Sequence, residues 1–525
     1  MDEYSITVIG RGTWWGSIEL NRESSSAPSK SDEGRAQWIA PETYPVFDRL
    51  IFFLFVLALP PLLGSVWSVF RDGDVSWHVA AGRWILEHRS VPSTDPFSFT
   101  MAGKPWIAFE WGAEVIYAVA YNIAGFAGLA ATVTLALIVL FGVVFGYLRE
   151  RAGPLALLIA LAGMLLVLQP FIMARPHVIA LPFLAAWSVL MFKYRDENRS
   201  PPLALALLIF VWANIHGSYF VGFVVAAAAA LDSLIATKFD RKVLLGWSSF
   251  GFAILVAAAL NVNGIEGLIH PLTISRMETL PSIGEWHPST PGATPLFYLL
   301  LLAVTGALLW KRPCFRPGEL LLLLLTLGMA FTHIRHQSVF IVLAALVVTP
   351  KLSNVVRETG GPLFPLSTEA RVWTVAAALA ALVIVGVRAV VPLQPRETFS
   401  NPRGLIAHIP PELRSQPMLN EYSMGGPLIL NGIRVYIDGR ADMYGDDFFK
   451  AYLKMSDGDW EVFNRMVKNY DLRWTILQND NRLVEKLDMS PDWRRIYSDE
   501  VGVIHVRRAG AAAPVRETNF NGKSK

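Results

Sequence analysis

Long apolar runs, separated by short polar links, occupy most of the chain. A helix of about 20 apolar residues crosses the roughly 30 Å hydrocarbon core of a bilayer. The pattern therefore predicts a polytopic α-helical membrane protein with about eleven transmembrane helices. We place them at 50–70, 126–148, 154–173, 178–194, 203–216, 219–236, 243–262, 295–310, 318–332, 337–350 and 372–392. The stretch 111–124, WGAEVIYAVAYNIA, is open to interpretation as a separate helix at the membrane interface.

The pattern changes after the last apolar run. Strand-like runs, RVYIDGR, RWTILQ and VGVIHVRR, alternate with the helix-like runs DDFFKAYLKM and DWEVFNRMVKNY. This alternation predicts a small α/β domain at residues 393–510. The chain then divides into a disordered N-terminus, a transmembrane domain that includes a first outer loop, the α/β domain and a disordered tail. Their bounds are 1–48, 49–392 (loop 71–111), 393–510 and 511–525.

Composition supports the membrane interpretation and excludes some functions. Of 525 residues, 53% are hydrophobic and 17% are charged, whereas soluble proteins have about 25% charged residues. A net charge of +3 is too small to indicate nucleic-acid binding. The single cysteine, Cys314, excludes an internal disulfide framework. The first apolar run starts too late and is too long for a signal peptide, so we interpret it as a retained anchor.

The distribution of Lys and Arg predicts the topology. With a cytoplasmic N-terminus, the inner links are RERAGP, KYRDENRSPP, KFDRK, KRPCFRPG and the segment 351–371. These links are richer in Lys and Arg than the outer ones, as the positive-inside rule requires. An odd number of spans then places the C-terminal α/β domain outside the cytoplasm. We expect a multi-pass protein of the cell (inner) membrane.

Polar residues gather at the predicted outer ends of separate helices. The stretch RDGDVSWHVAA follows the first run directly, and further polar residues lie in the links FEW, ARPH, ANIHGSY, GEWHPSTP and FTHIRHQ. Charges at the membrane edge are costly and indicate function by default. We expect them to converge on one polar cavity at the outer interface. Transporters usually have polar groups near the midplane, a pattern that this sequence does not show.

The residue types in these links suggest group transfer from a lipid-linked phosphate. Asp72 or Asp74 can act as a general base on an acceptor, or hold a metal that does so. Arg175 or Arg335 can neutralise a phosphate leaving group. A polyprenyl phosphate would bring its phosphate to this depth with its tail still in the bilayer. Structural interpretations stay open, because Asp is a favoured helix cap and Arg can anchor a helix at the interface.

Residues 50–110 resemble the first span and first outer loop of the GT-C superfamily of membrane glycosyltransferases, which includes aminoarabinose transferases and protein O-mannosyltransferases. The resemblance rests on an acidic motif, an amphipathic helix and a closing proline, here RDGDVSWHVAAGRWILEHRSVP with Pro92. The segments ARPHVIALP, WANIHGSYFVG, NVNGIEGLIHP and NEYSMGGPLILNGIRVYIDGRADMYGDDF are similar to a bacterial branch of GT-C-like proteins. One departure is Gly73, which separates two acids that are often adjacent in the family.

The resemblance implies a glycosyltransferase that uses a polyprenyl-phosphate sugar and an extracytoplasmic glycan, lipid or protein acceptor. We expect Asp72 and Asp74 to be catalytic. The candidates for binding phosphate or substrate are Arg175, Arg335, His78, His177, His216, His336, Glu110 and Glu285. The acceptor-side candidates are Asp438, Arg440 and Asp442, for which an ion-pair network that holds a loop is the alternative.

The sequence leaves several alternatives open. The metal is unknown, and no cofactor is certain beyond the option of a divalent cation. The rival functions are a non-catalytic subunit that binds lipid or glycan, a transporter of polyprenyl-linked glycans, and an O-antigen ligase or polymerase.

Overall fold

The computed structural model describes residues 69–353 and 394–508, together with the single positions 372, 375, 379 and 383. The segments predicted to be disordered, 1–48 and 511–525, lie outside the described residues. The predicted spans at 50–70 and 372–392 lie almost entirely outside them. The prediction of about eleven spans is therefore not established by the structure.

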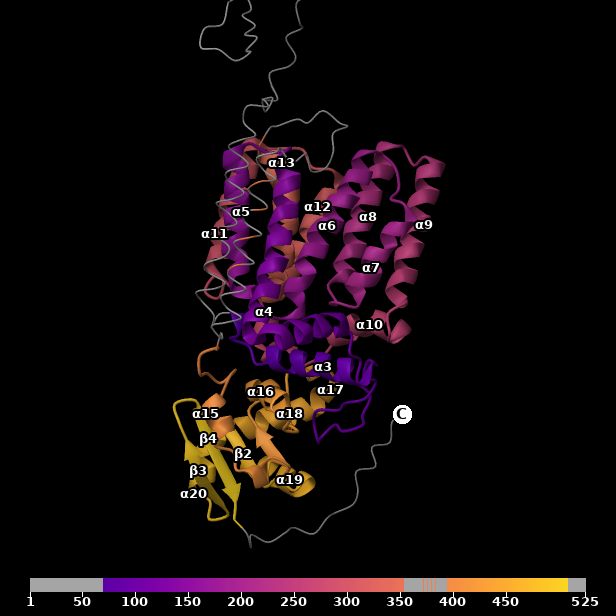
Figure 1. Ribbon diagram of the computed structural model, residues 1–525. Helices are drawn as coiled ribbons and strands as arrows, with labels where there is room; N and C mark the ends of the chain where they lie inside the picture. Colours follow the sequence, from indigo (N-terminus) through magenta and orange to yellow (C-terminus); the bar gives the residue numbers. More distant parts are fainter. Residues whose placement is uncertain are drawn as a thin grey trace, which may run out of the picture.

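A bundle of apolar helices makes up the larger part of the protein (Figure 1). Within the described residues, six helical segments are long and apolar enough to cross a membrane, which makes this a multi-pass membrane protein. They are α4 (Trp111–Leu148), α5 with η2 (Pro154–Phe171), α6 (Pro176–Asp196), α8 (Tyr219–Ala236), α9 (Arg241–Ala259) and η6 with α13 (Ile334–Ser353). The same part of the chain holds three shorter apolar helices: η3 with α7 (Leu203–Ala213), α11 (Pro295–Lys311) and α12 (Pro317–Thr332). Every predicted span in the described range coincides with one of these nine.

Proline sets the start of four bundle helices. Pro154, Pro176, Pro295 and Pro317 each stand in the first turn of α5, α6, α11 and α12. The first turn tolerates proline because its N–H groups have no partner within the helix. The sequence therefore marks where each helix leaves its link, and with it the ends at which polar residues can gather.

Helix α4 is two helices joined at a kink. Ala124 has φ −142° and ψ 20°, and Gly125 has φ 57° and ψ −139°, a conformation that favours glycine. The kink separates residues 111–123 from the apolar span that follows. The helix α3 (Asp74–His88) lies across one end of the bundle, between the bundle and the C-terminal sheet (Figure 1). Its Gly82 packs so closely on the first part of α4 that a Cβ there would lie 1.9 Å from the carbonyl oxygen of Glu114.

The C-terminal part is a small α/β unit at the same end of the bundle (Figure 1). Its sheet has the order β1-β2-β4-β3, and β1 pairs with β2 in parallel while the other pairs are antiparallel. The strands are β1 (Met418–Asn420), β2 (Trp474–Gln478), β3 (Trp493–Ser498) and β4 (Gly502–Arg507). The helices are α15 (Arg403–Ala407), α16 (Gly425–Leu430), α17 (Ala441–Tyr444), α18 (Asp446–Ser456), α19 (Trp460–Tyr470) and α20 (Arg482–Met489).

One predicted strand, RVYIDGR, is wrong. In this segment, 434–440, only Val435 makes a bridge, with Ser98 of the first loop. The Asn420 side chain accepts from the backbone N–H of Tyr436 at 2.9 Å and donates to the carbonyl of Ile437 at 2.7 Å. Since buried backbone groups need partners, the Asn420 side chain takes the place of the hydrogen bonds that a neighbouring strand would have made to this segment. The other predicted strands coincide with β2 and β4, whereas the sequence reasoning missed β1 and β3.

Candidate functional site

The acidic turn at the start of α3 holds the first two site residues. The backbone N–H of Asp74 donates to Asp72 Oδ1 at 3.0 Å, so the Asp72 side chain does make a local turn contact. Both side chains also line a cavity between the bundle and the C-terminal part. Turn formation is therefore only part of what these two aspartates do.

Arg175 lies at the centre of a cluster of carboxylates. It stands in the short link that precedes α6, where Pro176 begins the helix. Its guanidinium is 2.9 Å from Asp72 Oδ2, 3.0 Å from Asp74 Oδ2 and 2.9 Å from Glu285 Oε2. A guanidinium has five N–H donors in a planar fork, which suits it to bridging several acids.

A second arginine extends the cluster. Arg335 Nη1 donates to Glu285 Oε1 at 3.0 Å, and its Cζ lies 4.5 Å from the centre of the Trp286 ring. Glu285 and Trp286 belong to the 3₁₀ turn η5 (Gly284–Trp286). We call the five ionic residues the carboxylate–arginine cluster: Asp72, Asp74, Arg175, Glu285 and Arg335. They come from four separate segments of the chain, and the sequence reasoning named all five.

Two carboxylates of the cluster, Asp74 and Glu285, differ in their pKa values. Burial, and next the charge of Asp72, raise the pKa of Asp74 to about 7 against the opposing effect of Arg175. Burial also acts to raise the pKa of Glu285, but Arg175 and Arg335 together outweigh it and bring that pKa to about 2. Near neutral pH Glu285 is therefore a fixed anion, while Asp74 can gain and lose a proton.

A second group of polar residues lies beside the cluster. Glu110 Oε1 is 3.4 Å from His216 Nε2, and Glu110 Oε2 is 4.0 Å from His78 Nε2. Burial raises the pKa of Glu110 to about 8, and burial lowers the pKa of His78 and of His216 well below the usual value. At neutral pH both imidazoles are thus uncharged and Glu110 is largely protonated. Glu114, which sequence reasoning missed, lies 3.6 Å from His78 Nδ1.

The two remaining predicted histidines bond to backbone carbonyls. One nitrogen of His177 lies 2.8 Å from the carbonyl oxygen of Phe171, and one nitrogen of His336 lies 3.3 Å from that of Met329. Each of these bonds fixes the orientation of a ring. Both residues also line an apolar cavity that adjoins the cluster.

Two cavities meet at the cluster. The polar cavity, of about 390 Å³, is lined by Asp72, Asp74 and Arg175 and by residues of the C-terminal part such as Tyr422 and Asp442. The apolar cavity, of about 620 Å³, lies between α6, α8, α10 (Gly264–Ile274) and the start of α13. Glu110, Glu285 and Arg335 line both. A ligand with a polar head and an apolar tail can therefore place its head at the cluster.

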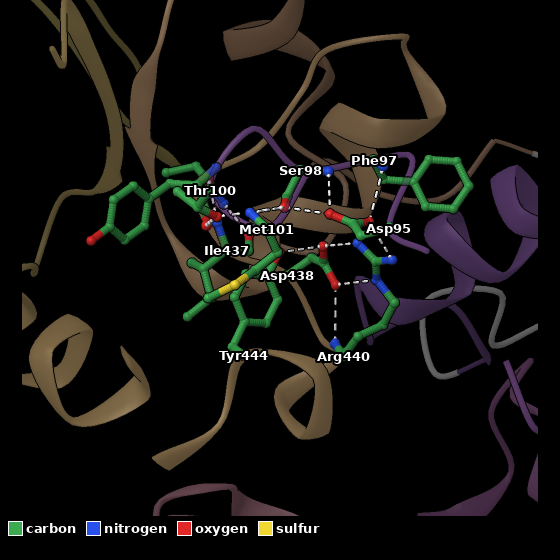
Figure 2. Close-up of polar contacts among 11 residues, drawn as sticks. Asp95, Phe97, Ser98, Thr100, Met101, Ile437, Asp438, Arg440 and Tyr444 are labelled. Carbon is green, nitrogen blue, oxygen red and sulfur yellow. Dashed lines mark hydrogen bonds and ion pairs between the residues drawn. The ribbon is translucent and has the colours of Figure 1, made fainter. Parts of the chain in front are cut away.

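The acceptor-side candidates occupy different environments. Asp438 is fully buried and lines neither cavity; it accepts from Arg440 Nη2 at 2.7 Å and from the Tyr444 hydroxyl at 2.8 Å. Arg440 also donates to Asp95 in the first loop at 2.8 Å, as Figure 2 shows. Asp442 lines the polar cavity and pairs with His270 at 2.9 Å. Asp438 and Arg440 thus share a buried ion-pair network, and Arg440, like Asp442, also lines the polar cavity.

The carboxylates of the carboxylate–arginine cluster do not fit a divalent cation, which the sequence analysis had kept as an option. The space between Asp72, Asp74 and Glu285 is filled by the guanidinium of Arg175. In the parts of the chain that the structure describes, no group of three or more His, Cys, Asp or Glu side chains is placed to hold a metal ion.

Comparisons with known proteins give the fold. No protein-family model matches the sequence, and no curated protein matches it significantly. The apo oligosaccharyltransferase of Archaeoglobus fulgidus is similar in structure, with 12% identity, 84% of this chain and 70% of that chain covered, and a TM-score of 0.51. A second similar structure is that of ArnT from Cupriavidus metallidurans bound to undecaprenyl phosphate, with 12% identity, 91% of this chain and 100% of that chain covered, and a TM-score of 0.48. The fold is GT-C-like, as the resemblance of the first loop predicted.

Proposed function

We propose that the protein is a membrane glycosyltransferase that moves a sugar from a polyprenyl-phosphate donor to an acceptor outside the cytoplasm. The observation that carries the proposal is the position of the carboxylate–arginine cluster, at the junction of an apolar and a polar cavity. The oligosaccharyltransferase-like fold supports it at the level of fold alone.

The two cavities suggest where each substrate binds. The apolar cavity suits the isoprenoid tail of the donor, with the phosphate near Arg335. Arg175 is already shared by three carboxylates, whereas Arg335 meets one, Glu285. Arg335 therefore has more capacity to neutralise a phosphate. The polar cavity, bordered by the C-terminal part, suits the acceptor.

Asp74 is the best candidate for the general base. A base works best when its pKa lies near the operating pH, and that of Asp74 is about 7. In the proposed step Asp74 takes the proton of an acceptor hydroxyl or amine, and the acceptor atom bonds to the anomeric carbon. The bond from that carbon to the phosphate oxygen breaks, and its electrons leave with the polyprenyl phosphate, whose charge Arg335 offsets.

The proposed membrane orientation follows from the charged residues at the helix ends. The ends of α6, α8, α12 and α13 opposite the cluster carry ion pairs such as Arg195–Glu319, at 3.0 Å, and Lys351–Glu319, at 2.9 Å. Lys and Arg favour the cytoplasmic side. We therefore place the cluster and the C-terminal part outside the cytoplasm, with the N-terminus inside and the protein in the cell (inner) membrane.

The test is turnover by the purified protein and by Asp72→Asn and Asp74→Asn, with a panel of polyprenyl-phosphate sugars and acceptors. Released polyprenyl phosphate and transferred sugar are both measured. We expect Asp74→Asn to lose about 100-fold or more of the turnover, while the exposed control Asp447→Asn keeps it. Donor binding without any new glycosidic bond in the wild type would instead favour a binding subunit or a transporter.

A further inference from the structure

The acidic turn is enclosed by the C-terminal part at several points. The Ser400 hydroxyl donates to the carbonyl of Arg71 at 2.6 Å. A Cβ on Gly73 would lie 2.0 Å from the carbonyl oxygen of Ser423, and a Cβ on Gly426 would lie 2.1 Å from the carbonyl oxygen of Gly73. Such close backbone approach requires glycine on both sides.

Gly439 makes the closest approach to a site carboxylate. A Cβ on this residue would lie 1.8 Å from Asp74 Oδ1 and 2.4 Å from Asp74 Cγ. The Asp74 carboxylate therefore lies between Gly439 on one side and Arg175, at 3.0 Å, on the other. The two neighbours of Gly439, Asp438 and Arg440, are fixed by the buried network of Figure 2.

The C-terminal part also holds the segment that leads to Glu285. Asp446 accepts from the backbone N–H of Thr279 at 2.9 Å and from its hydroxyl at 2.6 Å. Glu285 follows six positions later, in η5. The turn that carries Asp74 and the segment that leads to Glu285 are thus both held by contacts with the same small α/β unit.

We propose that Gly73, Gly426 and Gly439 are positioning residues, through which the C-terminal part seats the acidic turn so that Asp74 faces Arg175. The consequence for turnover rests on the function proposed above; the seating itself does not. This role also accounts for Gly73 between the two aspartates, because a side chain there would separate the turn from Ser423.

The three glycines differ in what a methyl group would displace. At Gly439 the nearest atoms belong to the end of a rotatable side chain, so Gly439→Ala moves the Asp74 carboxylate at little cost to the backbone. At Gly73 and Gly426 the nearest atom is a backbone carbonyl oxygen, so alanine there forces two segments apart. Gly439→Ala is therefore the informative variant. Gly292→Ala is the matched control, since Gly292 is exposed and a Cβ there meets nothing within 4 Å.

The first readout is steady-state kinetics of the whole chain with the polyprenyl-phosphate sugar of the panel above that the wild type turns over. Gly439→Ala is expected to lower kcat by about 100-fold, as small misplacements of reacting groups do, with the donor KM unchanged. It should also move the acid limb of the pH–rate profile. Gly292→Ala should match the wild type in all three quantities. A Gly439→Ala protein with wild-type kcat and an unmoved acid limb would overturn the consequence for turnover, whereas the seating itself is decided by the second readout.

The second readout needs no turnover. Carboxyl groups of the folded, full-length proteins are labelled with a carbodiimide and an amine, and labelling is quantified at each residue by mass spectrometry. Asp74 should label faster in Gly439→Ala than in the wild type and Gly292→Ala, while the exposed Asp447 labels equally in all three. Equal labelling at Asp74 would overturn the seating even if the wild type transfers sugar. Faster labelling in a protein that turns over no donor would support the seating and count against the proposed function alone.

Discussion

The guanidinium of Arg175 lies 2.9 Å from the carboxylate of Asp72, although 103 residues separate the two in sequence. The contact joins the link before α6 to the turn that begins α3. Asp74 and Glu285 share the same guanidinium. The carboxylates therefore have their counter-ion before any substrate binds, and such preorganisation of charge is a large part of enzymatic rate enhancement.

The variant Arg175→Lys should show whether turnover needs only a positive charge at position 175 or also the planar fork of the guanidinium. Lysine keeps the positive charge but presents one compact ammonium, which does not reproduce a fork that reaches three carboxylates. We expect kcat to fall by at least about tenfold, equivalent to about 1.4 kcal/mol. Arg335→Lys, which loses a contact with one carboxylate, should instead mainly raise the donor KM. Steady-state kinetics of both variants test this, and an unchanged kcat in Arg175→Lys would contradict it.

Asp72→Asn should move the acid limb of the pH–rate profile. The base must be ionised to accept a proton, so kcat/KM should rise with pH through the pKa of Asp74, about 7. The Asp72 charge is one cause of that raised pKa. Removing it lowers the pKa of Asp74, and the limb should shift to lower pH. Profiles of the wild type and the variant measure the shift; a limb that stays in place or moves to higher pH would assign the titration to another group.

Glu110 should make the stability of the protein depend on pH. Its folded pKa is about 8, whereas an unfolded glutamate has a pKa of about 4.3. Between these values the folded state binds more protons than the unfolded state, so this contribution to stability is lost as pH rises. Glu110→Gln mimics the protonated form and should flatten the curve. Thermal unfolding from about pH 5 to about pH 9 tests it, and two parallel curves would contradict it.

The buried network between the first loop and the C-terminal part should contribute to stability. Arg440→Met leaves Asp438 and Asp95 without their cation in the interior. Breaking a buried ion pair in this way costs about 3–5 kcal/mol. Arg473→Met removes an exposed pair with Asp471 and should cost at most about 1 kcal/mol. Denaturant unfolding compares the two, and equal effects would show that burial of the network adds nothing.

The sequence predicted the site residues best where polar side chains stand at the ends of apolar helices. Asp72, Arg175 and Glu285 were predictable because charged residues at the membrane edge cost free energy and so indicate function. The order of the apolar spans then shows that all three lie at the same end of the helix bundle. The role of Gly439 was not predictable, because close approach between distant segments leaves no periodicity. Asn420 shows the same limit in the fold, since its side chain takes the place of a strand at Tyr436 and Ile437.

The apolar cavity should determine the affinity for the donor tail. Leu272 lines it from α10 and is 47% exposed, so Leu272→Trp adds bulk without overpacking a buried core. We expect the KM of a long-chain donor to rise by roughly tenfold, or about 1.4 kcal/mol, while kcat is unchanged because the cluster is untouched. A short-chain donor should be unaffected, since its tail does not reach the added ring. Leu302→Trp on α11, 71% exposed and outside both cavities, is the control. If Leu272→Trp and Leu302→Trp behave alike toward long and short donors, the tail does not bind in this cavity, and the acceptor becomes the better candidate for it.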